Sequence, residues 1–430
     1  MATLLDDCFR PGSKRLLHAE ALSILKSRTR TTAPTERVAI AQVCGRVAAA
    51  ALHAPRPIPA HTNAAVDGYA FAYRDYAQER GAELLLAGRA AAGHPAEHRL
   101  QPGQCVRIFT GAVMPEGCDT VVMQEDVRLS GAQVHVPPGL KPGANRRLAG
   151  EDVPAGHELF APGTRLRPQD VAALAAAGFA EVECHQRLEV AVISTGDEVV
   201  APGGALRPGQ VYDANAPMLT GLIEAGGARV HPCGIWPDDP GLIRSRLTEL
   251  AGSHSVIISS GGASMGEEDH MVRALASLGT CHLWQLAIKP GRPMAFGQIA
   301  TGSGAAARTC VFVGLPGNPV AVFVCFLMYV RPLLAALGGQ RWPEPRRYQL
   351  PAAFAFKGRK PGRREFWRGL LREGPDGQLL VDKFARDGSG LISGLRAADG
   401  LIEIAEERGD IRVGEPVDFI PFSEFGIIGG

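Results

Sequence analysis

Three carboxylates, Glu267, Glu268 and Asp269, follow a short apolar run in the stretch VIISSGGASMGEEDH (256–270). The run ends in two serines and two glycines before the acids begin. Glycine lets backbone amides approach a bound phosphate, and carboxylates can share a phosphate site when a divalent cation lies between them. Taken alone the stretch is ambiguous, because such glycines often form only a turn and such acids often only favour a helix N-terminus.

Two other apolar runs end in a similar way. LEVAVIS leads into TGDEVV, which contains Glu198, and CVFVG leads into LPGNPV. Because ligands of open α/β sheets bind beyond the carboxyl ends of the strands, three such loops favour one shared site. We expect this site to combine phosphate-binding amides with carboxylates that hold Mg²⁺. The candidate ligand-binding residues of these loops are Ser260, Gly261, Gly262, Pro316, Gly317 and Asn318.

Other charged residues have two interpretations each. Lys289 and Arg292 in AIKPGRP could bind an oxyanion or a phosphate, although a solvated basic turn fits the same spacing. Asp67 in NAAVDGYAF and Asp152 in GED would on their own be ordinary turn acids. The twelve histidines lack metal-ligand spacing and the nine cysteines form no C-x-x-C pair, which argues against zinc and iron–sulfur sites.

The three loops require a sheet that brings their strand ends together, and region 187–338 has the pattern of one. It contains the apolar strand candidates LEVAVIS, RVHPCGI, SVIIS, HLWQLAI and CVFVGL, most of them separated by helix-length segments. Continuous apolarity of this kind predicts an α/β domain with a largely parallel sheet buried on both faces. The segment 318–338 is expected to be a helix packed on that sheet.

The flanking regions predict three further parts. Helices are expected at KRLLHAEALSILKSR (14–28) and PQDVAALAAAGF (168–179), within a helical linker domain made of 14–54 and 152–186. Between them, short alternating runs and Gly-Pro turns predict an inserted β domain over 55–151. In region 339–430 the turn EGPDGQ joins FWRGLL to LLVDKF as a hairpin, so we expect a C-terminal β domain, a small barrel or sandwich.

Composition excludes several classes of partner. The 430 residues exceed what one hydrophobic core usually supports. The net charge of +1 indicates no affinity for nucleic acid or an anionic membrane. The N-terminus lacks the apolar core of a signal peptide, and the longest apolar run, 320–330, is too short for a bilayer core of about 30 Å. With an odd number of scattered cysteines, a cytoplasmic location is expected.

The collected motifs resemble those of one family, the molybdopterin molybdenumtransferases of the MoeA type, which include the E domain of gephyrin. The motifs occur in the family's order, from about residue 14 to the C-terminus: TNAAVDGYA, RIFTGAVMPEGCDTVV, AGEDV, ISTGDEV, GQVYDAN, DDP, ISSGGASMGEEDH, IKPGRP and LPGNPV. The resemblance implies an elongated four-domain subunit with a central domain similar to the MoaB/MogA proteins. It also implies a cytoplasmic homodimer that contacts the upstream molybdopterin adenylyltransferase.

The implied activity is insertion of molybdenum from molybdate into adenylated molybdopterin, with Mg²⁺ as cofactor and release of AMP. The family's functional positions correspond here to Asp67, Thr110, Asp152, Glu198, Asp238, Asp269, Lys289 and Ser389. Among them Glu198, Asp238 and Asp269 are the expected metal ligands. The resemblance also implies a cleft between the central domain of one subunit and domains of its partner.

Several residues depart from the family pattern. Gln285 stands where the family often has Lys, which removes one positive charge near the expected anion site, and Arg292 replaces a frequent Lys with retention of charge. Three alternatives stay open: a non-catalytic scaffold or molybdate-binding protein, a molybdopterin adenylyltransferase, and a CinA-like pyrophosphatase. The last two would need only the central domain. A preference for tungstate over molybdate is compatible with the same motifs.

Overall fold

The computed structural model describes residues 15–262, 270–302 and 308–427, and a six-stranded sheet in the order β16-β13-β17-β21-β20-β18 lies at the centre of the α/β region. The strands from β16 to β21 are parallel, while β20 and β18 add antiparallel at one edge. Their bounds are β13 (Glu189–Thr195), β16 (Arg229–Trp236), β17 (Val256–Ser260), β18 (Gly279–Gln285), β20 (Pro293–Thr301) and β21 (Arg308–Leu315). A short parallel pair, β14 (Val199–Val200) with β15 (Val211–Tyr212), lies outside this sheet.

Both faces of the sheet are buried, because alternate residues of its strands pack into different cores. Val190 and Val192 of β13 lie in one core with α3 (Asn215–Ala225). Ala191 and Ile193 lie in the other core, with α4 (Pro240–Ser253) and α5 (His270–Leu278). The predicted multidomain α/β class with a largely parallel sheet is confirmed. Strand β20 was not predicted, because the proline and the glycine in PMAFGQIAT weaken its strand signal.

The helix predicted after Asn318 is present. It consists of α6 (Pro319–Cys325), a π-helical turn η4 (Phe326–Val330) and α7 (Arg331–Leu337). Pro319 occupies the first helical position, where its missing N–H costs no hydrogen bond. The whole segment, Pro319–Leu337, has 19 residues and is long and apolar enough to cross a bilayer, whereas the run 320–330 alone is too short. However, 83% of its most apolar window is buried inside the protein. Here it is a core helix.

The N-terminal part of the chain joins two distant regions. Helix α1 (His18–Arg28) packs beside η4, where His18 Nδ1 lies 2.7 Å from the Tyr329 hydroxyl. The chain then forms two antiparallel pairs next to α2 (Pro168–Ala176), so the two predicted helices are confirmed. These pairs are β1 (Thr35–Ala39) with β12 (Glu181–His185) and β2 (Leu52–His53) with β11 (Glu158–Phe160).

A second six-stranded sheet is inserted between β2 and β11, in the order β7-β4-β6-β5-β9-β8. Its strands are β4 (Gly68–Phe71), β5 (Ala82–Ala90), β6 (Gln104–Ile108), β7 (Thr120–Met123), β8 (Arg128–Ser130) and β9 (Gln133–Val136), and the pair β3 (Asn63–Ala64) with β10 (Arg146–Arg147) adjoins them. The sheet has hydrophobic cores of its own, which contain Phe71 and Ile108. Short 3₁₀ turns are η1 (Ile40–Gln42), η2 (Tyr73–Asp75) and, near the C-terminus, η5 (Phe422–Phe425).

The C-terminal strands form a third sheet, in the order β19-β23-β25-β26-β22, with β24 paired to β23. The elements are β19 (Ile288–Lys289), β22 (Tyr348–Pro351), β23 (Arg364–Glu373), β24 (Leu379–Lys383), β25 (Gly400–Ile404), β26 (Pro416–Pro421) and α8 (Ile392–Ala397). The predicted hairpin is confirmed by the antiparallel pairing of β23 with β24. A closed barrel is not confirmed. Strand β19 comes from the α/β region, so the two regions share a sheet.

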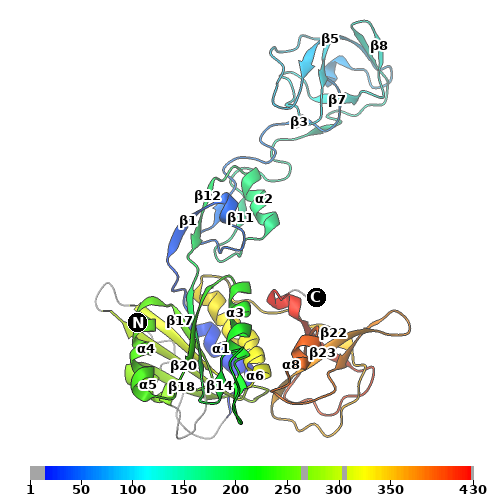
Figure 1. Ribbon diagram of the computed structural model, residues 1–430. Helices are drawn as coiled ribbons and strands as arrows, with labels where there is room; N and C mark the ends of the chain where they lie inside the picture. The colour runs from blue at the N-terminus through cyan, green and yellow to red at the C-terminus, as the bar shows by residue number, and fades with distance from the viewer. Residues whose placement is uncertain (1–14, 263–269, 303–307, 428–430) are drawn as a thin grey trace.

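The described chain is elongated (Figure 1). The inserted sheet with β5, β7 and β8 lies at one end, and β1, β11, β12 and α2 form a middle part. The α/β region and the C-terminal strands lie side by side at the other end.

Candidate functional site

A cavity of about 540 Å³ lies between the loops of the α/β region and the C-terminal sheet. From the α/β side it is lined by Gly261, Gly262, residues 289–293 and residues 316–318. From the C-terminal side it is lined by Phe366, Trp367, Arg368, Lys383, Phe384 and residues 387–389. Its volume is typical of sites for small organic ligands, which span roughly 300 to 1,000 Å³.

The glycine pair after β17 is required by its surroundings. A Cβ on Gly261 would lie 2.8 Å from the carbonyl oxygen and from Oγ1 of Thr195, and a Cβ on Gly262 would lie 3.0 Å from Met271 Cβ. Both glycines also have positive φ, +92° and +67°, which other residues rarely adopt. The Gly261 N–H donates to the Leu315 carbonyl at 3.1 Å. In this conformation the Gly261 amide is engaged with a neighbouring strand, and its binding of a phosphate stays a prediction.

Asn215, at the start of α3, connects two of the predicted loops. Its Nδ2 donates to Ser260 Oγ and to the Gly317 carbonyl, each at 2.7 Å. Ser260 is buried and does not line the cavity, so it supports the loops from behind. The Asp213 carboxylate holds Asn215 in place by accepting from its backbone N–H at 3.0 Å. Asn215 was not singled out from the sequence, although it lies in the motif GQVYDAN.

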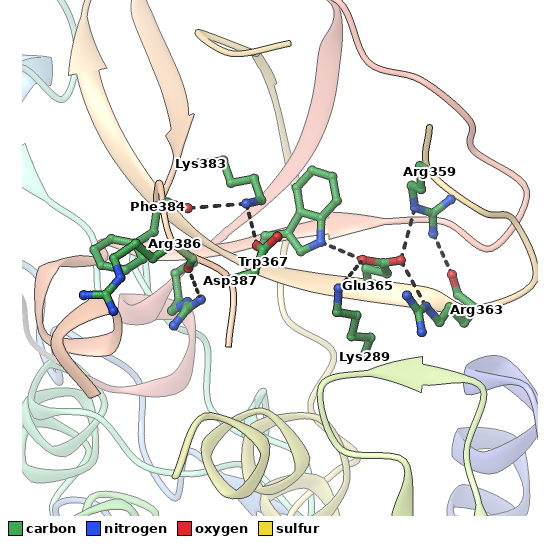
Figure 2. A network of polar contacts seen from close by, with 10 residues as sticks. Lys289, Arg359, Arg363, Glu365, Trp367, Lys383, Phe384, Arg386 and Asp387 are labelled. Carbon is green, nitrogen blue, oxygen red and sulfur yellow. Dashed lines mark hydrogen bonds and ion pairs between the residues drawn. The ribbon is translucent and has the colours of Figure 1, made fainter. Parts of the chain in front are cut away.

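Lys289 is placed at the cavity by strand pairing. In the parallel pair of β19 with β23, Lys289 is in register with Glu365. Its Nζ lies 3.9 Å from Glu365 Oε2, and the Glu365 side chain is only 4% exposed (Figure 2). Trp367 Nε1 donates to the same carboxylate at 2.9 Å and Arg363 Nε at 3.1 Å, while Arg359 Nε lies 3.7 Å away. One buried carboxylate thus faces three cations.

A second polar group holds the loop that carries Ser389. Lys383 Nζ donates to Asp387 Oδ1 at 2.7 Å, and this bond is the main reason why the pKa of Asp387 is lowered (Figure 2). Arg368 donates to the carbonyl of Arg386 at 2.7 Å. The Ser389 carbonyl in turn accepts from the Val320 N–H at 2.9 Å, at the start of α6. The cavity wall from the C-terminal sheet is therefore fixed to the α/β region.

Glu198 and Asp238 follow neighbouring parallel strands. Thr195 of β13 is in register with Trp236 of β16, and each acid comes shortly after its strand. Both acids are exposed, and neither lines the cavity. The third predicted metal ligand, Asp269, lies outside the described residues, as do Glu267 and Glu268. Within the described part of the chain, no three His, Cys, Asp or Glu residues lie close enough together to hold a metal ion.

Asp67 and Thr110 contact each other, but not the cavity. Asp67 Oδ1 accepts from the Thr110 N–H at 2.8 Å and from its hydroxyl at 2.7 Å. The backbone bond, followed by the hydroxyl bond, lowers the pKa of Asp67. Both residues lie beside strands of the inserted sheet, at the opposite end of the chain from the cavity (Figure 1). Asp152 is exposed near the base of that sheet, where its N–H donates to the Ile58 carbonyl at 3.1 Å.

The structure therefore divides the predicted residues into groups. Eight of them line the cavity, namely Gly261, Gly262, Lys289, Arg292, Pro316, Gly317, Asn318 and Ser389. Asp67, Thr110, Asp152, Glu198 and Asp238 do not. Four further lining residues, Trp367, Arg368, Lys383 and Asp387, were missed, because only strand pairing between distant segments brings them to the cavity. Glu365, which does not line the cavity but faces Lys289, was missed for the same reason.

Comparison with known proteins finds matches along most of the chain. Residues 17–178 match the MoeA N-terminal region (domain I and II), 191–336 a probable molybdopterin binding domain, and 349–422 the MoeA C-terminal region (domain IV). The molybdopterin molybdenumtransferase of Haemophilus influenzae is 36% identical over 391 residues, which cover 90% of this chain and 94% of that protein. Molybdopterin molybdenumtransferase 1 of Mycobacterium tuberculosis is 30% identical over 412 residues, which cover 91% and 95%. The solved structure of the molybdopterin biosynthesis moeA protein from Pyrococcus horikoshii OT3 is 29% identical and superposes with a TM-score of 0.79, over 95% of this chain and 100% of that one.

Proposed function

This chain belongs to the molybdopterin molybdenumtransferases, the enzymes that insert molybdenum in molybdenum cofactor biosynthesis, and we propose that its substrates are molybdate and adenylated molybdopterin. The products would be the molybdenum-loaded cofactor and AMP, formed in the cytoplasm. The observation that carries this proposal is the cavity between the α/β loops and the C-terminal sheet, with Lys289 at its wall beside the buried Glu365.

The charges in this wall suit an anionic substrate. Lys289, Arg292, Arg368 and Lys383 all line the cavity, whereas Asp387 is the one acid among its described lining residues. Cleavage of the adenylate phosphoanhydride increases negative charge on the phosphate oxygens. Cations fixed beforehand in a partly desolvated cavity stabilise such charge without reorganisation at the moment of reaction. Lys289 is held in this way by its register with Glu365, and its half-exposed side chain is accessible to a ligand.

We propose Mg²⁺ as the metal cofactor. Glu198 and Asp238 supply hard oxygen ligands at neighbouring strand ends, which is the ligand type that Mg²⁺ prefers. Together with Asp269 they would form the donor set. When bound, the ion would supply positive charge to the phosphoanhydride oxygens.

We further propose a homodimer whose site is shared between subunits. Asp67 and Thr110 lie at the far end of the chain from the cavity (Figure 1). If they act on the same substrate as Lys289, they must come from a partner subunit. A two-fold dimer of elongated chains can provide this arrangement, because the inserted sheet of each subunit can then lie next to the cavity of its partner. Contact with the upstream molybdopterin adenylyltransferase, which would supply the substrate, belongs to the same proposal.

Reconstitution of a molybdenum-free enzyme tests the proposed function. The purified protein, adenylated molybdopterin, molybdate and Mg²⁺ are incubated and then mixed with an apoenzyme that requires the cofactor. Activity of the apoenzyme that depends on this chain is the expected result. An apoenzyme that stays inactive, while the chain remains folded and dimeric, would instead favour a scaffold.

A further inference from the structure

A second cavity lies where the middle part of the chain meets the α/β region. It measures about 60 Å³ and is lined by residues 45–47, 165 and 185–188 from the middle part and its connection to β13. From the other side it is lined by the C-terminal end of α3, with Gly226 and Gly227, and by α7. It shares no described lining residue with the cavity beside Lys289.

The lining of this cavity carries an excess of positive charge. Four arginines, Arg46, Arg165, Arg187 and Arg331, lie in its wall, and none of its described lining residues is an aspartate or a glutamate. Arg46 is neutralised by an ion pair with Glu36. The other three form no ion pair with a carboxylate among the residues that the structure describes.

Two of these arginines are held in place by uncharged partners. Arg165 Nη2 donates to the carbonyl of Ala225, near the end of α3, at 3.1 Å. A Cβ on Gly227 would lie 3.2 Å from the same Nη2, so glycine with its φ of +90° leaves room for the guanidinium. Arg331 Nη2 donates to the Glu424 carbonyl at 3.1 Å, and its guanidinium lies over the Phe425 ring.

The electrostatics of the cavity favour an anion. Burial lowers the pKa of both Arg165 and Arg331. Repulsion adds to this effect, from Arg187 on Arg165 and from Arg165 on Arg331. Glu424 is the opposing charge that acts on Arg331; the two form no ion pair, and the Glu424 carboxylate accepts from the Tyr348 hydroxyl at 3.2 Å. Arg165 and Arg331 are partly buried and have no ion-pair partner among the described residues, which is costly, and a bound anion would relieve that cost.

We propose that this cavity binds a tetrahedral oxyanion between Arg165, Arg187 and Arg331. Guanidinium groups donate paired hydrogen bonds to oxyanions, and arginine is well suited to their geometry. The space corresponds to roughly four water molecules, since one water needs about 15 Å³ by this measure. That suits phosphate, sulfate or molybdate rather than a nucleotide. The anion would link the middle part of the chain to the α/β region. It would thereby fix the orientation of the middle part and of the inserted sheet attached to it.

The test compares oxyanion binding in matched variants of the full-length protein. Inorganic phosphate and sodium molybdate are titrated separately by calorimetry at constant ionic strength. The binding event at this cavity is expected to persist in Lys289→Gln, which removes a cation only from the other cavity. It is expected to weaken at least about tenfold in Arg165→Gln/Arg187→Gln, as for loss of a charge-assisted contact. Arg128→Gln/Arg244→Gln removes two exposed arginines that line neither cavity and is the charge-matched control.

Crystals soaked in molybdate give a second readout that does not depend on the variants. An anomalous peak among the three guanidinium groups is the expected result, and its loss on competition with phosphate would identify phosphate as the preferred anion. Binding that is unchanged in the double variant, or no anomalous peak in this cavity at saturating molybdate, would overturn the proposal. Neither outcome depends on catalytic turnover, so the proposed function is tested separately.

Discussion

Lys289 and Glu365 are register partners on neighbouring parallel strands, and their charged atoms lie 3.9 Å apart although 76 positions separate them in the sequence. The pairing exists because two residues of the α/β region, Ile288 and Lys289, join the edge of the C-terminal sheet. A cation at the cavity wall is thus oriented by a buried carboxylate of another region. The relationship assigns Glu365 a positioning role toward Lys289.

Replacement of Glu365 by Gln is expected to reduce both stability and activity. It removes the negative charge that faces Arg359, Arg363 and Lys289, and leaving buried charges without a partner typically costs about 3 to 5 kcal/mol. We expect the free energy of unfolding to fall by about 3 kcal/mol and kcat/KM to fall about tenfold. Urea denaturation and AMP release measure the two effects.

A double-mutant cycle separates positioning from general damage. If Glu365 acts through Lys289, adding Glu365→Gln to Lys289→Gln should cost little further activity. Additive losses of activity in the double variant would contradict the positioning role. Glu373→Gln, an exposed acid on the same strand, is the control and should match the wild type.

Replacement of Gly291 by Ala is expected to distort the loop that carries Lys289 and Arg292. A Cβ at this position would lie 2.3 Å from Cys325 Sγ, and the φ of +101° is strained for any other residue. We expect a loss of about 3 kcal/mol in the free energy of unfolding, from strain and overpacking together. Thermal or urea denaturation measures it.

Gly358→Ala supplies the matched control for this clash. Gly358 also has a positive φ, +74°, but a Cβ there would meet nothing within 4 Å. Its loss of stability therefore reports backbone strain alone. Equal losses for Gly291→Ala and Gly358→Ala would show that the close approach of Gly291 to Cys325 has no energetic consequence.

His18 is expected to make the protein sensitive to mild acid. Burial, followed by repulsion from Arg364 and Arg347, lowers the pKa of His18 to about 3. The unfolded chain binds a proton at this histidine below about pH 6.5, whereas the folded chain does not until about pH 3, so stability is lost as the pH falls through this window. The loss is about 1.4 kcal/mol per pH unit, or about 2 kcal/mol between pH 6.5 and 5.

His18→Gln removes this contribution and can keep a hydrogen bond to the Tyr329 hydroxyl. Urea midpoints of this variant should therefore fall less between pH 7 and 5 than those of the wild type. His98→Gln, an exposed histidine in the inserted region, is the control. If the urea midpoints of the wild type and of His18→Gln change equally with pH, His18 is not a buried neutral imidazole in the folded protein.

Mixed dimers test whether Asp67 and Lys289 act in one site built from two subunits. Asp67→Asn and Lys289→Gln homodimers are each expected to keep at most about a tenth of the wild-type activity. After subunit exchange, half of the dimers are mixed and each mixed dimer has one intact site, so activity should return to about one quarter of wild type. No recovery, although exchange is shown by mass spectrometry, would place both residues in a site within one chain or in separate sites.

Much of the fold follows from local patterns in the sequence. Runs such as VAVIS and VIIS predict buried parallel strands because their apolarity is continuous, and the EGPDGQ turn predicts the hairpin of β23 with β24. The sequence predicts the glycines at 261 and 262 as part of the candidate site, and both line the cavity. Which of their amides is available could not be predicted, because the Gly261 N–H is bonded to Leu315 on a neighbouring strand.

The features of the site that local patterns do not predict depend on pairing between distant segments. The register of Lys289 with Glu365 and the two hydrogen bonds of Asn215 join segments far apart in the sequence, and single-residue patterns carry no information about them. The same holds for the separation of Asp67 from the cavity. The family motifs group Asp67 with Lys289 as functional positions, whereas the structure places them at opposite ends of an elongated chain.

The most direct test of the function is AMP release from adenylated molybdopterin by the purified protein with Mg²⁺, measured with and without molybdate. We expect release to rise with molybdate, and kcat/KM to fall about tenfold to a hundredfold in Lys289→Gln as a charge-assisted contact is lost. Lys357→Gln, an exposed lysine of the C-terminal region, should behave as the wild type. AMP release that is indifferent to molybdate, or no release from a folded dimer, would contradict the assignment of this cavity as the site of molybdenum insertion.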